Sequence, residues 1–97
     1  MRVKIKTKYI DEECEIKKTP YSNGRIALLL VTSAGEHVAV ATVHLPDLPL
    51  ADGYTFIKDY SENEGLLKAL QDAGVIGPVV DIVHLGYVDA YKVKVLI

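Results

Sequence analysis

The most regular feature of the chain is a pair of apolar runs around a short polar break. Residues 25–45 read RIALLLVTSAGEHVAVATVHL, with Ser33-Ala34-Gly35-Glu36 between the two runs. Runs rich in β-branched residues, separated by small residues that include a Gly, are typical of a β-hairpin. The first run is apolar on both faces, which predicts an interior strand covered on two sides. We therefore expect a central hairpin over residues 25–45.

Strict alternation of basic and largely apolar residues predicts a strand over residues 2–9. One face carries Arg2, Lys4, Lys6 and Lys8, and the other carries Val3, Ile5, Thr7 and Tyr9. Lysines on an outer strand discourage edge-to-edge aggregation, so we expect this strand at the edge of a sheet. Residues 13–18 predict a second short strand, on which Cys14 and Ile16 face inward.

Further strand patterns follow the hairpin. Residues 54–58 predict a short strand. Residues 79–85 and 87–97 predict two strands around Gly86, with the alternative that Gly86 is a bulge in one long bent strand. Gly77-Pro78 predicts a break in regular structure before these strands.

A helix is predicted over residues 61–73. Ser61 followed three positions later by Glu64 fits a capping box, in which each side chain bonds a backbone amide of the first turn. The apolar stripe of this helix consists of Leu66, Leu67, Leu70 and Ala73. Gly74 follows, at the position where a left-handed residue commonly ends a helix.

These elements predict a single α+β domain over residues 1–97. We expect a curved, mainly antiparallel sheet of about five to six strands, with the helix packed on one face. One helix covers only one face of such a sheet. The two-sided apolar character of the hairpin then requires sheet curvature, the 46–53 loop or a second protein chain as a further cover.

Composition narrows the class of protein. The chain is 49% hydrophobic and has six Tyr, no Trp and a single Cys, Cys14. It is therefore an ordered domain that forms no internal disulfide, which fits a reducing compartment. No apolar run is long enough to span a bilayer, and residues 1–8 do not resemble a signal peptide. We expect a cytoplasmic protein with no membrane contact.

The charge is distributed unevenly along the chain. The formal net charge is −2, which argues against direct nucleic-acid binding. Residues 1–35 carry +3, residues 36–89 carry −7, and residues 90–97 carry +2. Such asymmetry can steer a partner, although acidic side chains also serve simply to solvate loops and helix faces.

Candidate catalytic and metal-binding groups are few. The possible ligands are Cys14, His37, His44 and His84. Their spacing matches no zinc pattern, although His44 and His84 would form a pair if their strands were neighbours. Cys14 lies between Glu13 and Glu15, whose charge raises a thiol pKa, so we interpret it as a small hydrophobic residue. We therefore predict no enzymatic activity, no metal and no cofactor.

Carboxylates and tyrosines gather in one stretch of the sequence, between residues 47 and 64. The candidate partner-binding residues are Asp47, Asp52, Tyr54, Asp59, Tyr60, Glu62 and Glu64. A surface of carboxylates and Tyr suits a Lys/Arg-rich groove on a protein partner, such as a nucleic-acid channel. The alternative is that these groups only solvate the loops and the start of the helix.

Four segments resemble a family of small uncharacterised proteins carried by plasmids, conjugative elements and phages. They are Tyr21–Leu28, Gly35-Glu36, Ala41–Pro46 and Phe56–Gly65. The family pattern includes Tyr-x-Asn-Gly-Arg and Ile-Lys-Asp-Tyr-Ser-Glu-Asn-Glu-Gly, and the resemblance spans about residues 20–75. His44 departs from it, because the family has Asn there.

The resemblance implies a genetic context and no established activity. Small proteins of mobile elements include anti-defence factors, such as inhibitors of CRISPR effectors, that act by stoichiometric binding. It therefore implies a non-enzymatic inhibitor that blocks a basic, nucleic-acid-binding surface of a host defence complex. Two alternatives remain: a homo-oligomeric assembly protein, which in the simplest case is a homodimer, and a small metal-binding protein.

Overall fold

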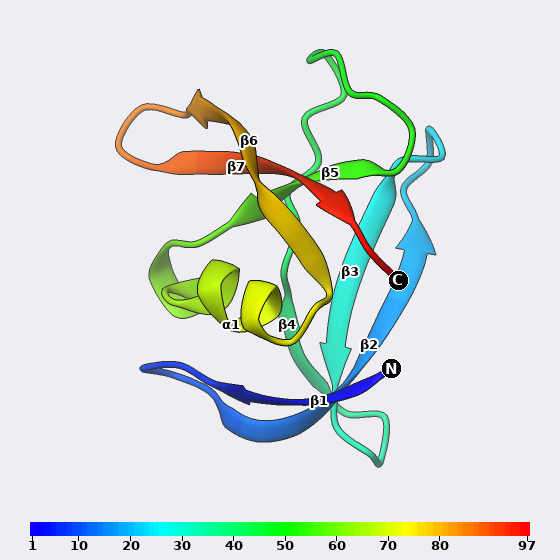
Figure 1. Ribbon diagram of the computed structural model, residues 1–97, viewed down its shortest axis with the longest axis vertical. Helices are drawn as coiled ribbons and strands as arrows, with labels where there is room; N and C mark the ends of the chain where they lie inside the picture. The colour runs from blue at the N-terminus through cyan, green and yellow to red at the C-terminus, as the bar shows by residue number, and fades with distance from the viewer.

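The computed structural model describes all residues, 1–97, and has an α+β architecture (Figure 1). The elements are β1 (Arg2–Lys6), β2 (Asp11–Pro20), β3 (Ile26–Val31), β4 (His37–Val40), β5 (Tyr54–Lys58), the 3-10 helix η1 (Ser61–Asn63), α1 (Leu66–Asp72), β6 (Ile76–His84) and β7 (Asp89–Val95). The α+β class is confirmed. The single sheet of five to six strands is wrong in detail, because seven strands form two antiparallel sheets, ordered β1-β2-β3-β4 and β5-β7-β6.

The predicted hairpin is the β3–β4 pair of the first sheet. Leu30 pairs with Ala39, and β3 lies between β2 and β4 as an interior strand. Its burial is two-sided, as the apolar pattern predicted, because Ala27 and Leu28 are both buried. The hairpin is less central than expected, since β4 is the last strand of its sheet.

The N-terminal strands are also close to their predictions. β1 is an edge strand, but it ends at Lys6, so that Tyr9 is 55% exposed instead of facing the core. On β2, Cys14 and Ile16 face inward and are buried. β2 is longer than predicted and runs to Pro20.

The second sheet confirms one prediction, two strands around Gly86, and corrects another, the break at Gly77-Pro78. β6 and β7 form a hairpin closed by a bond from the Leu85 amide to the Val88 carbonyl (2.7 Å), so Gly86 is a turn residue and not a bulge. Gly77-Pro78 does not break the structure. It lies inside β6, where the pairing with β7 shifts register between Ile76 and Val79, so the sheet absorbs the Pro at an irregularity.

The segment after β4 joins the two sheets. The Ala41 amide donates to the Leu28 carbonyl on β3 (2.9 Å), while the Ala41 carbonyl accepts from the Lys58 amide on β5 (3.0 Å). Thr42 pairs with Ile57 in an isolated antiparallel bridge. The strands therefore lie side by side in the order β1-β2-β3-β4-β5-β7-β6 and form a continuous curve. This curvature helps to cover the apolar faces of the hairpin, as the sequence pattern required.

The helix fills the space inside this curve. In Figure 1, α1 lies between β1 and β6, and it packs against β1, β5 and β6. Leu66 and Leu70 are fully buried, in one core with Ile5, Leu28 and Val93. The helix therefore covers the inner surface of both sheets and not one face of a single sheet. No helix of the chain has the length and apolar character needed to cross a membrane.

The N-terminal end of the helix differs from the capping-box prediction, whereas its C-terminal end agrees with the sequence pattern. Ser61 begins η1, the N-cap residues Tyr60 and Gly65 make no side-chain cap bond, and α1 starts after Gly65, whose φ is 90°. At the C-terminal end, the Gly74 amide bonds the Gln71 carbonyl and the Val75 amide bonds the Leu70 carbonyl, each at 3.0 Å. These two bonds form a Schellman motif around Gly74 (φ 76°), which confirms the predicted helix stop.

The 46–53 loop is fixed by an arginine at the start of the hairpin. The two terminal nitrogens of Arg25 donate to the carbonyls of Leu45 (2.7 Å) and Leu48 (2.5 Å). The residues that open the loop lie beside the end of the β6–β7 hairpin, where Leu48 and Leu85 line a common hollow. The loop is therefore held between the start of β3 and the end of the β6–β7 hairpin.

Candidate functional site

The structure divides the seven candidate partner-binding residues between the two ends of β5. Asp59, Tyr60, Glu62 and Glu64 follow the strand, whereas Asp47 and Asp52 lie on the loop before it and Tyr54 is its first residue. Asp52 and Tyr54 line a hollow of about 250 Å³ with the 23–26 turn, and Asp47 lines a different one. The carboxylates therefore do not form one surface: Asp47 and Asp52 lie apart from each other and from the group that follows β5.

The larger group lies on a tight segment, residues 59–65, which we call the acidic turn. The Asn63 amide bonds the Tyr60 carbonyl (3.0 Å), and the Glu64 amide bonds the Ser61 carbonyl (3.1 Å). Ser61 adopts φ 54°, which a residue with a side chain seldom does. Such a backbone conformation persists only where the surrounding structure fixes it, so contacts with the rest of the fold must hold this turn.

Asn63 anchors the acidic turn to the protein. Its side chain is 1% exposed, and its Nδ2 donates to the Val40 carbonyl (2.7 Å) and the Lys58 carbonyl (3.4 Å). The amide thus satisfies backbone acceptors at the ends of β4 and β5. Sequence reasoning missed this residue, because periodicity gives no signal for a buried Asn. Its position inside the Ser-Glu-Asn-Glu segment was the one available indication.

Two further contacts hold the turn. Gly65 lies against the loop after β1, where a Cβ on Gly65 would come within 3.3 Å of Thr7 Cβ. A carboxylate oxygen of Asp59 accepts the Leu67 amide (3.1 Å) at the start of α1. Asp59 is therefore occupied by a structural bond, so its charge is less available to a partner than the sequence suggested.

Glu62 and Glu64 are the free charges of the acidic turn. Both side chains are exposed, and neither belongs to any of the protein's six ion pairs. Tyr60, beside them, is half-buried. The turn thus presents two unpaired carboxylates, next to a half-buried tyrosine, on a backbone that the rest of the fold holds in place.

Cys14 has the environment of a core residue. It is fully buried, and burial raises the pKa of its thiol, with a smaller contribution from the charge of Glu12. The sequence assigned this effect to Glu13 and Glu15. That cause is wrong, because those side chains lie on the opposite, exposed face of β2. A buried neutral thiol is a poor nucleophile and a poor metal ligand.

The histidines have separate surroundings. His84 Nδ1 lies 2.7 Å from a carboxylate oxygen of Asp89, while His44 stacks on Tyr21 with ring centroids 4.3 Å apart. His44 and His84 do line one hollow of about 350 Å³, and the buried Nε2 of His44 has no hydrogen-bond partner. No group of three or more His, Cys, Asp or Glu side chains is arranged to hold a metal ion.

Comparison of the chain with protein-family models, with curated protein sequences and with solved structures gives no match.

Proposed function

We propose that the protein is a non-enzymatic binding module that presents the acidic turn to a basic surface of a protein partner. The observation that carries the proposal is the pair of exposed, unpaired carboxylates, Glu62 and Glu64, on a turn anchored by the buried Asn63. In this proposal the partner surface normally binds nucleic acid, and the module blocks it without binding nucleic acid itself.

Rigidity of the turn favours binding over simple solvation. A partner that docks on a flexible loop must order its backbone, at roughly 1–2 kcal/mol for each residue that becomes fixed. The acidic turn has its backbone fixed before binding by Asn63, by the packing of Gly65 on Thr7 and by the bond from Leu67 to Asp59. Carboxylates on such a fixed backbone can complement a basic surface without further loss of backbone entropy on binding.

The resemblance of residues 20–75 to proteins of mobile elements suggests which partner to test. We therefore propose a host defence complex whose nucleic-acid channel is rich in Lys and Arg, and an inhibitory role for this protein. Binding through carboxylates in water weakens as salt screens the charges, with a Debye length of about 10 Å at 0.1 M and about 3 Å at 1 M.

The experiment is a pull-down from host lysate at low and high salt, followed by mass spectrometry. The test variant is Glu62→Lys with Glu64→Lys, which reverses both free charges and leaves Asp59 and Asn63 in place. The matched control is Asp47→Lys with Asp52→Lys, an equal change of charge at the other end of β5. A nucleic-acid-handling complex retained by the wild type and the control, and lost by the test variant, supports the proposal. Equal retention by all three proteins excludes the acidic turn.

A second candidate function is assembly with further copies of the chain. It is favoured by β6, an outer strand on which Val80 is 56% exposed and Ile82 46% exposed. The apolar C-terminal stretch, residues 93–97, adds little to this surface, because Val93 and Val95 are buried in the core and, of its apolar residues, Leu96 alone is largely exposed (53%). Sedimentation over micromolar concentrations distinguishes the two functions: a single monomeric species rules out assembly.

A further inference from the structure

Two strands, β1 and β6, end the continuous run of strands, and each leaves one edge without a neighbouring strand. An open edge carries a row of unpaired N–H and C=O groups, to which an extended chain can add as a further strand. The two edges differ in how far the protein itself blocks them.

The edge of β6 is obstructed. The Ile82 amide, which would face an added strand, is bonded to a carboxylate oxygen of Asp81 (2.9 Å). Pro78 has no amide proton, and the pairing of β6 with β7 shifts register at two places between Ile76 and Asp81. These features interrupt the regular spacing that strand addition requires.

The edge of β1 is regular and open. The Thr7 amide bonds the Ile10 carbonyl, and the Ile16 amide bonds the Met1 carbonyl, both at 2.7 Å, so odd-numbered residues of β1 pair with β2. In an antiparallel pair the alternate residues point their N–H and C=O groups away from the partner strand. The backbone groups of Lys4 and Lys6 therefore face outward, and neither residue takes part in a backbone bond outside the strand ladders.

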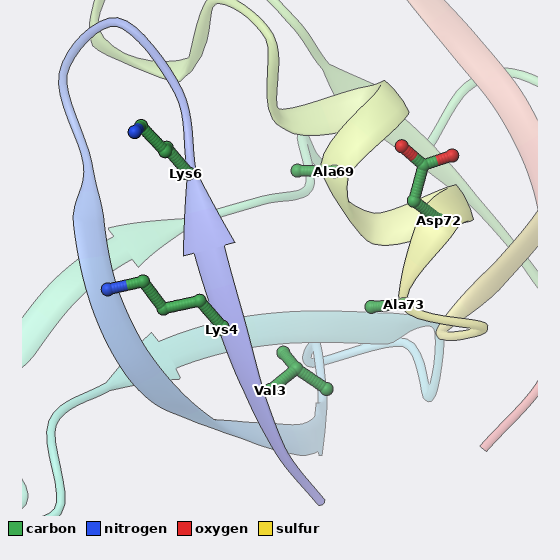
Figure 2. Close-up of a pocket in the computed structure, with 6 residues that line it drawn as sticks. All are labelled: Val3, Lys4, Lys6, Ala69, Asp72 and Ala73. Carbon is green, nitrogen blue, oxygen red and sulfur yellow. The ribbon is translucent and has the colours of Figure 1, made fainter.

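A groove of about 450 Å³ runs along this edge, with α1 as its second wall (Figure 2). It is lined by Val3, Lys4, Lys6, Ala69, Asp72 and Ala73. Figure 2 shows the side chains of Lys4 and Lys6 extending away from α1, so they leave the strand edge uncovered. The wall formed by the helix carries the small side chains of Ala69 and Ala73, which leave space beside the strand.

Charge indicates what the groove accepts. On the paired side of β1, carboxylates of β2 neutralise the basic row, with Lys4 Nζ 2.9 Å from Asp11 and Arg2 Nε 3.5 Å from Glu13. These acids occupy every second position of β2. The one acid in the lining, Asp72 on α1, is paired with Lys68 (3.1 Å), whereas Lys6 has no ion-pair partner. A strand on the open side that carried acids at every second position would complement the same row of bases.

From these observations we infer that the open edge of β1 binds an extended acidic segment of a partner protein by strand addition, in the groove between β1 and α1. Backbone bonds to Lys4 and Lys6 hold the segment. Its acidic side chains lie beside the lysines, and the alternate side chains, which are small and apolar, point toward Val3 and Ala69. This surface is separate from the acidic turn, so the inference stands or falls independently of the proposed function.

The test is an NMR titration of the ¹⁵N-labelled full chain with a synthetic peptide of four Glu-Val repeats. Shifts confined to β1 and to residues 69–73 are the expected result. Two control peptides have matched length: four Lys-Val repeats, and the Glu-Val peptide N-methylated at every amide, which has no N–H left to donate from either edge. Neither control is expected to bind. Shifts that instead follow β6, or equal binding of the methylated peptide, would overturn the inference.

Two variants separate backbone pairing from charge. Lys6→Pro removes an amide that makes no bond within the protein, and we expect it to weaken peptide binding by roughly tenfold, since it removes a hydrogen bond and the charge together. Lys6→Gln keeps the amide and is expected to cost roughly twofold to fivefold, the value of an exposed ion pair. The control is Lys17→Gln on β2, which should bind as the wild type does. Unchanged binding by Lys6→Pro, with a folded spectrum, would contradict the inference.

Discussion

At the scale of single residues, Asn63 links the candidate site to the core. Its side-chain amide bonds carbonyls at the ends of two strands from different sheets, β4 and β5. A sequence pattern identifies apolar residues by their period, but a buried polar residue is defined by acceptors far away in the chain. The charges of the acidic turn could therefore be predicted from the sequence, and the residue that supports them could not.

We predict that Asn63→Ala lowers the free energy of unfolding by about 1–3 kcal/mol, because it leaves the partly buried Val40 and Lys58 carbonyls without this donor. Urea denaturation measures this loss. The matched control is Glu62→Ala, an exposed change one residue away, which should stay within about 0.5 kcal/mol of the wild type. An Asn63→Ala protein as stable as that control would show that the anchor contributes nothing.

The ion pair between Lys4 and Asp11 gives a prediction about pH. The hydrogen bond from Lys4, followed by its charge, lowers the pKa of Asp11 below the ordinary value of 3.8. The folded state therefore binds this proton less readily than the unfolded state, and the pair stabilises the fold above the ordinary pKa. That contribution is lost as the pH falls from the ordinary value through the lower pKa of the folded state.

Carboxyl NMR titration of Asp11 measures the effect directly. Lys4→Met is expected to raise the pKa of Asp11 toward its ordinary value and to flatten this part of the stability profile. Lys6→Met removes only a weaker and more distant charge, so it should raise the pKa less. If both variants gave the same pKa, the direct bond between Lys4 and Asp11 would not be its main cause.

At the scale of elements, the strands follow their sequence patterns more closely than the helix does. The bounds of β5 agree with the prediction, and the Gly74 stop is confirmed, because both depend on neighbouring residues. The helix start was wrong because Gly65 adopts a left-handed conformation that divides the segment into η1 and α1. The capping pattern around Ser61 is local, but the packing of Gly65 on Thr7 is not.

Asp59 accepts the bond that the predicted cap would have accepted at the start of α1, so its removal should lower the stability of the protein. We predict that Asp59→Ala lowers the free energy of unfolding by about 1 kcal/mol, since the Leu67 amide loses its acceptor near the positive end of the helix dipole. Asp59→Asn keeps an oxygen acceptor and should lose less. Thermal or urea unfolding of the two variants tests the order; an Asp59→Asn protein that is less stable than Asp59→Ala would contradict it.

At the scale of the whole molecule, the need for curvature could be predicted from the sequence, but the strand pairing that produces it could not. A hairpin apolar on both faces required more cover than one helix supplies, and the fold meets this need with a curved run of strands. The junction at Ala41, Thr42 and Ile57 depends on which strands meet. Alternation along the chain does not contain that information, because each strand pattern fits several neighbours.

This junction leads to a prediction about cooperativity. Residues 41–43 bond β3 on one side and β5 on the other, and the core beneath them includes residues of both sheets, such as Leu28 and Val93. The two sheets should therefore unfold as one unit.

In hydrogen exchange, the amides of Ala41, Val43 and Lys58 should open with a free energy close to that of global unfolding by urea. The unpaired edge amides of Lys4 and Lys6 should exchange fast in the same experiment and so serve as the internal control. A lower opening free energy throughout β5, β6 and β7 than in β2 and β3 would mean that the sheets are separate units and that the junction does not couple them.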